Sequence, residues 1–209
     1  MAISNECLPP PGRGTRGIDH LLGAFPPGQL SEIVGPWSSG AGSLLLALVA
    51  RATASGHQVG LVDGADTFDA ASAVAAGADL SRLLWVRCSG RLRRAFSAAD
   101  LLARCPGFSL IAVDLGDPAL GRREPLPPSL CLRLKLAAEQ SDTTLVLRAP
   151  NRLAGSAAAL VVSARRVEAR WIGRPRPARL AGVSGEVHIV RSRSHLAGTA
   201  GSWSIPWRL

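Results

Sequence analysis

Short apolar runs alternate with longer amphipathic or alanine-rich segments along the first 150 residues of the chain. The runs are five to seven residues long, which is typical of strands buried on both faces of a parallel sheet. They predict strands at residues 30–34, 59–63, 83–88, 108–114 and 143–147. The segments between them predict helices over residues 43–55, 66–76, 95–105 and 127–140.

Beyond residue 157 the helical pattern stops, and apolar and polar residues alternate with a period of two. We expect strands at residues 160–164, 167–172 and 185–193, with a turn region at 173–182. In the last of these strands, one face carries Val187, Ile189, Arg191 and Arg193. The pattern therefore predicts an antiparallel extension at one edge of the sheet.

Together these elements predict an α/β fold with a mostly parallel sheet, helices on both faces and a C-terminal antiparallel hairpin. A chain of 209 residues suits one domain with a sizeable core. We expect residues 1–16 to be a flexible leader and residues 17–209 to form the domain. Its parallel part would cover about residues 28–150, and its antiparallel, basic part about residues 157–209.

The segment from Gly35 to Ser43 lies between the first strand and the first long helix, and two of its glycines, Gly35 and Gly40, stand five positions apart. This is the frame of a phosphate-binding P-loop, which continues with Lys and then Ser or Thr. Here those positions are Ala41 and Gly42, and the only lysine in the chain is Lys135. Backbone N–H groups could still hold an anion weakly, but catalysed phosphoryl transfer needs a cationic clamp.

The run 108–114 ends in Asp114, as does a Walker B strand, whose carboxylate orients Mg²⁺ or water beside the P-loop. With Ala41 and Gly42 opposite it, we interpret Asp114 as kept for structure. We therefore expect no catalytic residue, no cofactor and no metal. Changing Ala41 should do little, whereas breaking the turn at Gly35 or Gly40 should unfold the domain.

The net charge of +9 lies in the last third of the chain, where residues 148–209 carry 11 arginines against Glu168 and Glu186. Such a region fits nucleic acid or an acidic protein partner, and a solvated arginine-rich surface is the alternative. The terminal tryptophans either complete a final strand packed on the core or anchor a partner. The candidate contacts to DNA or a partner are Arg148, Arg152, Arg191, Arg193, Trp203 and Trp207.

The four cysteines and four histidines are dispersed and lack metal-ligand spacing, which argues against a zinc site or a disulfide framework. No apolar run approaches the roughly 20 residues of a membrane span, and the N-terminal segment is polar and proline-rich. We therefore expect a cytoplasmic protein without a membrane partner.

Four segments carry a resemblance to the RecA recombinase family. They are residues 17–43 (GIDHLLGAFPPGQLSEIVGPWSSGAGS), 61–69 (LVDGADTFD), 108–114 and 161–195. The resemblance implies a RecA-type core and places Ala65 where the family has its water-activating carboxylate. Three parts of one mechanism would then be replaced, at Ala41, Gly42 and Ala65. The short leader, the short loop 148–155 and the early end of the chain also argue against an ATP-driven filament.

A compact RecA relative without ATPase residues is similar to the ImuA proteins, which belong to a DNA-damage-induced (SOS) translesion mutagenesis system. That resemblance implies a non-enzymatic adaptor, associated with the nucleoid, whose partners are an ImuB-like homologue of Y-family polymerases, an error-prone C-family polymerase and RecA. Sequence-independent DNA binding and homo-oligomers remain open. The alternatives are an SOS-type cell-division inhibitor and a residual ATP-binding RecA paralogue that takes its cation from Lys135 or from a neighbour's arginine.

Overall fold

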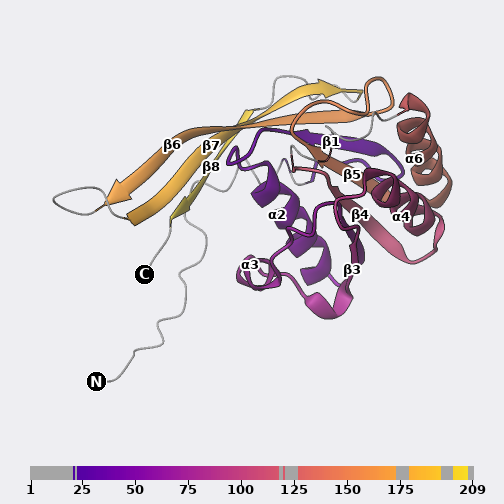
Figure 1. Ribbon diagram of the computed structural model, residues 1–209, viewed down its shortest axis with the longest axis horizontal. Coiled ribbons are helices and arrows are strands. Elements are labelled where there is room, and N and C mark those ends of the chain that lie inside the picture. The colour runs from indigo at the N-terminus through magenta and orange to yellow at the C-terminus, as the bar shows by residue number, and fades with distance from the viewer. Residues whose placement is uncertain are drawn as a thin grey trace.

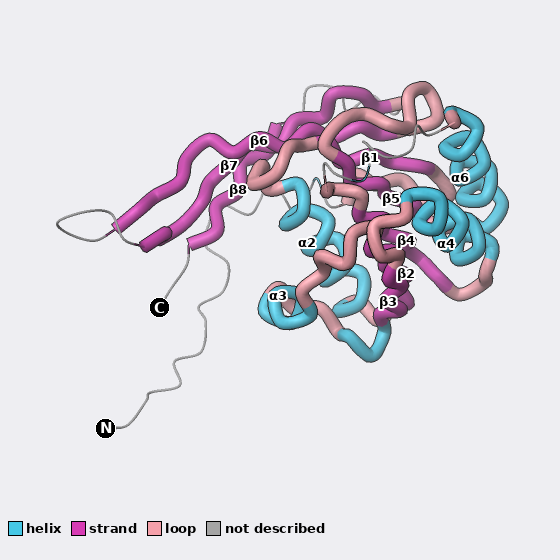
Figure 2. Tube along the Cα trace, in the orientation of Figure 1, coloured by secondary structure: helices cyan, strands magenta, loops and turns pink. Residues whose placement is uncertain are grey.

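The computed structural model describes residues 21, 23–117, 120, 127–172, 179–193 and 200–206. Over these residues eight strands form one sheet in the order β3-β2-β4-β5-β1-β6-β7-β8 (Figures 1 and 2). The strands are β1 (Leu30–Val34), β2 (Gln58–Asp63), β3 (Leu83–Arg87), β4 (Phe108–Asp114), β5 (Thr144–Ala149), β6 (Leu160–Ile172), β7 (Arg179–Ser192) and β8 (Ala200–Pro206). The helices are α2 (Ala41–Ala54), α3 (Ala70–Ala75), α4 (Leu92–Arg104) and α6 (Pro128–Ser141), with a 3-10 turn η1 at Leu80–Arg82.

The strands β1 to β5 pair only in parallel with one another, and β6 joins them by pairing in parallel with β1. The ladders β6–β7 and β7–β8 are antiparallel, and these three strands extend beyond the helical layers as an arm (Figure 1). The predicted fold class is therefore confirmed. Because β6 takes part in both kinds of pairing, the parallel part of the sheet continues past residue 150.

Helices cover both faces of the sheet because successive residues of its inner strands point to opposite sides. On one side α2 packs against residues such as Leu61 and Val146, and α3 in turn packs on α2. On the other side α4 and α6 cover residues such as Val62 and Leu145 (Figure 2). The inner strands are thus buried on both faces, which explains their uninterrupted apolar runs.

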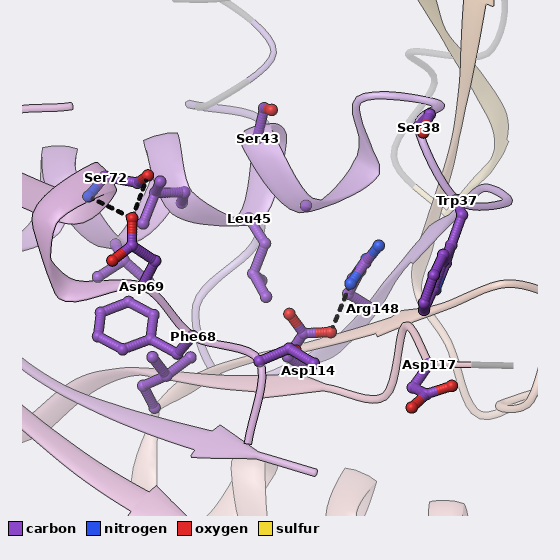
Figure 3. A pocket seen from close by; sticks show the side chains of 15 residues that line it. Trp37, Ser38, Ser43, Leu45, Phe68, Asp69, Ser72, Asp114, Asp117 and Arg148 are labelled. Carbon is purple, nitrogen blue, oxygen red and sulfur yellow. Dashed lines mark hydrogen bonds and ion pairs between the residues drawn. The ribbon is translucent and has the colours of Figure 1, made fainter. Parts of the chain in front are cut away.

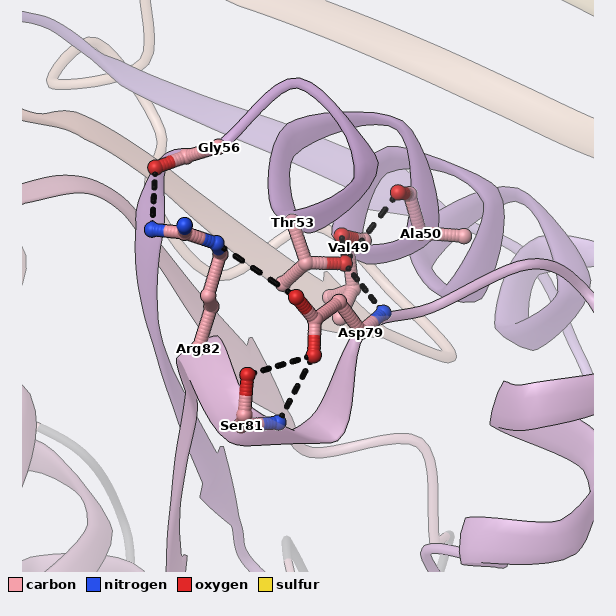
Figure 4. Close-up of polar contacts among 7 residues, drawn as sticks. All are labelled: Val49, Ala50, Thr53, Gly56, Asp79, Ser81 and Arg82. Atoms are coloured by element: carbon pink, nitrogen blue, oxygen red, sulfur yellow. Dashed lines mark hydrogen bonds and ion pairs between the residues drawn. The ribbon is translucent and has the colours of Figure 1, made fainter.

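A polar cluster fastens the start of β3 to the end of α2 (Figure 4). The buried Thr53 hydroxyl donates to the carbonyl of Val49 at 2.9 Å and accepts the N–H of Asp79 at 3.0 Å. Arg82 donates to the carbonyl of Gly56 at 2.8 Å and pairs with the Asp79 carboxylate at 3.4 Å. These contacts hold the β3 edge of the sheet against the helix that follows the P-loop segment.

Several predicted boundaries were wrong. The helices expected at 43–55, 66–76 and 95–105 run over Ala41–Ala54, Ala70–Ala75 and Leu92–Arg104. In α3 the late start has a clear cause, since the Asp69 carboxylate caps the helix by accepting the N–H of Ser72 at 3.0 Å.

The two strands expected at 160–164 and 167–172 form one strand, β6. It is continuous because β7 pairs with it over its whole length, with irregular register shifts along the ladder. Likewise β7 begins at Arg179, inside the segment expected to be a turn.

The expected leader, the prolines of the predicted turn and Trp207 lie outside the described residues. Trp203 belongs to β8, where it pairs with Gly185 of β7, so the chain does form a final strand here. Whether the tryptophan packs on the core or anchors a partner stays a prediction. Within the described residues, no helix combines the length and the apolar character needed to cross a bilayer.

Candidate functional site

The loop between β1 and α2 has the tight turn that its glycines predict. A Cβ at Gly35 would lie 2.3 Å from Ser39 Oγ and 2.8 Å from the carbonyl oxygen of Ala164, so only glycine fits there. Gly40 takes a left-handed conformation with φ of 90°, which glycine adopts without strain. The buried Ser39 hydroxyl accepts the N–H of Ala41 at 3.3 Å at the start of α2. The frame of the P-loop is therefore retained.

Ala41 and Gly42 form the first turn of α2, where a P-loop has its lysine and hydroxyl residue. Ala41 is 1% exposed and packs in the apolar cluster beneath α2. The expectation that changes at Ala41 do little is therefore not supported for larger side chains, because the cluster has no room for them. Gly42 faces Arg148, with which an added Cβ would make ordinary contact at 3.5 Å.

Asp114 at the end of β4 is joined to Arg148 at the end of β5 (Figure 3). The two residues are register partners on adjacent strands, and Arg148 Nη1 lies 2.7 Å from Asp114 Oδ1. The side chains are only 12% and 18% exposed. The same Oδ1 atom accepts the N–H of Gly116 at 2.9 Å, and the Gly116 carbonyl accepts the indole N–H of Trp37 at 2.7 Å. Asp114 thus holds β5 and the loop after β4 together.

The loop after β2 is built around Asp63, which is fully buried. Its carboxylate accepts the N–H groups of Thr67 at 3.0 Å and Phe68 at 2.9 Å and the indole N–H of Trp85 at 3.2 Å. Phe68 and Trp85 also meet edge to face, with ring centroids 5.1 Å apart. Ala65, in this loop, packs against the core on the α4 and α6 side.

A cavity of about 490 Å³ lies between the P-loop, α2 and the loop after β2 (Figure 3). It is lined by Trp37, Ser38, Gly42, Ser43, Leu45, Leu46, Val49, Leu61, Thr67, Phe68, Asp69, Ser72, Asp114, Asp117 and Arg148. Asp114 is engaged by the guanidinium of Arg148, and Asp69 is engaged as the cap of α3. Lys135 is not among the lining residues, since it lies on α6 and pairs with Glu139 at 2.8 Å.

The residues at this site do not fit Mg²⁺ and a nucleoside triphosphate. A P-loop enzyme uses a lysine, a hydroxyl ligand and a free carboxylate to hold that pair. Among the described lining residues the cation is Arg148, and it already binds the carboxylate. No three His, Cys, Asp or Glu side chains gather as a metal site elsewhere in the described part of the chain.

The candidate contact arginines divide into two groups. Arg148 is mostly buried beside Asp114, which leaves its guanidinium unsuited to the DNA or partner contact predicted for it. Arg191 and Arg193 instead donate to the carbonyls of Gly155 and Ser156, each at 2.9 Å. They fasten β7 to the loop that carries the exposed Arg152. The prediction that Arg152, Arg191 and Arg193 contact DNA or a partner stays a prediction.

Glu32 is a residue whose role the sequence did not reveal, although a charged side chain inside an apolar strand was a usable signal. It is fully buried in β1, and its Oε1 atom accepts the N–H groups of Leu153 and Ala154 in the loop after β5. Its Oε2 atom has no partner among the described residues. Burial raises the pKa of this carboxyl above 4.5, although the two N–H groups and nearby Arg152 act in the other direction.

The raised pKa of Glu32 predicts a pH-dependent stability. The folded state holds this proton more tightly than the unfolded state, so the contribution of Glu32 to stability should fall as pH rises from about 4.5 through the raised pKa. In Glu32→Gln that slope should be absent from urea unfolding curves, and the variant should be at least as stable as the wild type at pH 7. Identical pH slopes for the two proteins would contradict this account.

A matched control is Glu32→Leu, which keeps the volume but removes the acceptor of Leu153 and Ala154. Two buried donors without partners should lower the free energy of unfolding by about 2 kcal/mol or more at every pH. Comparison of the three proteins separates the charge of Glu32 from its hydrogen bonds.

Comparison with known proteins identifies relatives of the parallel part of the chain. A family model described as the RecA N-terminal domain matches residues 11–124. Protein RecA of Streptomyces coelicolor is 28% identical over 159 residues, which cover 68% of this chain and 42% of that protein. Protein RecA of Chlorobaculum parvum is 35% identical over 103 residues, which cover 48% of this chain and 29% of that protein. The chain thus spans less than half the length of these relatives.

The fold is similar to that of a solved protein, the RadB recombinase. The two structures superpose with a TM-score of 0.64 at 20% sequence identity, over 90% of this chain and 92% of that one. At this identity the likeness concerns the arrangement of the strands and helices.

Proposed function

Because the chain belongs to the RecA family, we propose that it is a non-enzymatic RecA-like accessory protein of damage-induced translesion synthesis, similar to the ImuA proteins. In this role it would bind a polymerase homologue of the Y family and act through its surfaces. Its P-loop would serve as a structural turn between β1 and α2.

One observation carries the proposal. The P-loop turn is retained in detail, while the three positions that would perform ATP hydrolysis hold Ala41, Gly42 and Ala65. A turn that is kept for catalysis would be expected to keep its cation. Retention of Gly35 and Gly40 without the chemistry instead favours a scaffold role. The resemblance to ImuA supplies the choice of partner.

The arginine-rich last third supports a second contact, to DNA, within the same proposal. Arg152 lies on the loop after β5, and Arg191 and Arg193 bind main-chain carbonyls of the same loop. Binding through such arginines would be independent of sequence and would weaken steeply with salt, because phosphate contacts release counterions.

The proposal is tested with the purified chain and a purified ImuB-like polymerase homologue. We expect a stable complex in size-exclusion chromatography and calorimetry without nucleotide, with the same affinity after Mg-ATP is added. Absence of a complex would contradict the proposed adaptor role. Heat from Mg-ATP and the chain alone, at sub-millimolar nucleotide, would instead favour the residual ATP-binding protein.

A further inference from the structure

The ion pair between Asp114 and Arg148 decides whether Asp114 is able to bind a divalent cation. Asp114 ends a Walker B-like strand, and its carboxylate would face a divalent cation in an active P-loop protein. Here a guanidinium nitrogen lies 2.7 Å from Oδ1 and supplies the positive charge from within the chain. Oxygen ligands of Mg²⁺ must be free to enter its coordination shell, and this one is taken.

Two glycines, Gly116 and Gly42, flank the guanidinium of Arg148. A Cβ at Gly116 would lie 1.8 Å from Arg148 Nη1, so no other residue fits at 116 while Arg148 keeps this position. On the opposite side, an added Cβ at Gly42 would lie 3.5 Å from Arg148 Cζ. Glycine is therefore required at position 116 while Arg148 keeps its place, whereas position 42 would also admit alanine.

Hydrogen bonds connect the Arg148–Asp114 pair to Trp37, which lines the cavity. The main-chain N–H of Leu115 donates to the Arg148 carbonyl at 2.8 Å, and Gly116 binds both Asp114 and the Trp37 indole. Arg148 is thus linked to the P-loop segment through Asp114, Gly116 and Trp37. Figure 3 shows Trp37, Arg148 and Asp114 among the residues that line the cavity.

We propose that Arg148 is the resident cation of this site: its guanidinium, seated between Gly42 and Gly116, neutralises Asp114 and excludes divalent cations from the cavity. The inference rests on the proposed non-enzymatic function and names the residue that keeps the site closed. Arg148 and Gly116 then form a matched pair, in which the glycine accommodates the arginine.

The test is thermal unfolding of the full chain, followed by tryptophan fluorescence, with and without 10 mM MgCl₂ at constant ionic strength. Arg148→Ala should lower Tm by about 10 °C, because it leaves a mostly buried carboxylate without a counter-ion. Mg²⁺ should then raise the Tm of this variant by about 4 °C if it binds with a Kd of about 1 mM. The wild type should not respond to Mg²⁺.

Two further variants complete the experiment. Arg94→Ala removes an exposed arginine of α4 and should neither change Tm by more than about 1 °C nor create a response to Mg²⁺. Asp114→Asn combined with Arg148→Ala should recover most of the lost Tm and abolish the Mg²⁺ response, and it remains measurable if Arg148→Ala alone does not fold.

A wild-type Tm in Arg148→Ala, or an equal Mg²⁺ shift in wild type and variant, overturns the inference. A double variant that is no more stable than Arg148→Ala overturns it as well. Each of these outcomes is measured on the chain without nucleotide or partner and differs from the failure of the proposed function, which would appear as binding of Mg-ATP by the wild type or as absence of the partner complex.

Discussion

Gly35→Ala is expected to lose most of its folded population, although the change adds only one methyl group. The new Cβ would lie 2.3 Å from Ser39 Oγ and 2.8 Å from the carbonyl oxygen of Ala164 in β6. Ser39 can rotate away, but β6 cannot retreat without losing its ladder with β1. We expect a loss of about 3 kcal/mol or more, since overpacking of a tight backbone contact is only partly relieved. Urea unfolding followed by circular dichroism measures the loss.

The same loop provides the control. Gly42→Ala places its Cβ at an ordinary contact distance of 3.5 Å from Arg148, and alanine favours a helix by about 1 kcal/mol over glycine. This variant should match or exceed the stability of the wild type. If Gly35→Ala and Gly42→Ala unfold at the same urea concentration, the close approach of Ala164 to the P-loop is wrong.

The core of the fold could be predicted because its information is local. Strands such as β4, expected at 108–114 and found at Phe108–Asp114, are continuous apolar runs that show directly in the sequence. The order of the elements predicts a parallel sheet, since alternating strands and helices leave few other arrangements. Boundaries were less accurate, because the start of α3 depends on Asp63 and Asp69, whose partners only the folded loop defines.

The candidate site was harder to predict, and Arg148 shows why. We expected the fifth strand to end at residue 147, which put Arg148 in a loop and made it a candidate for DNA contact. In the structure β5 continues to Ala149, because Val34 of β1 pairs with that residue. Those two extra residues turn Arg148 into the register partner of Asp114. The interaction joins positions 34 residues apart and has no signature in either local pattern.

Asp63→Leu is expected to be the most damaging change at the end of β2, where the loop that follows is built on this carboxylate. The carboxylate is fully buried and accepts hydrogen bonds from Thr67, Phe68 and the Trp85 indole. Leucine fills a similar volume but accepts none of them. Three partly buried donors would lose their partner, which should cost about 3 kcal/mol or more. The Trp85 emission should change in the folded state, and the urea midpoint should fall.

Burial is what makes Asp63 costly to replace, and Asp69 provides the comparison that isolates it. Asp69 also accepts three hydrogen bonds, from Ala71 N–H and from the N–H and hydroxyl of Ser72, but its side chain is exposed. Water can replace those bonds, so Asp69→Ala should lower the urea midpoint much less than Asp63→Leu does, as expected for a lost cap on an exposed helix start. Equal losses for Asp63→Leu and Asp69→Ala would show that the loop after β2 does not depend on its buried carboxylate. An intermediate loss for Asp63→Asn would support the account, because an amide keeps one oxygen acceptor for the three donors.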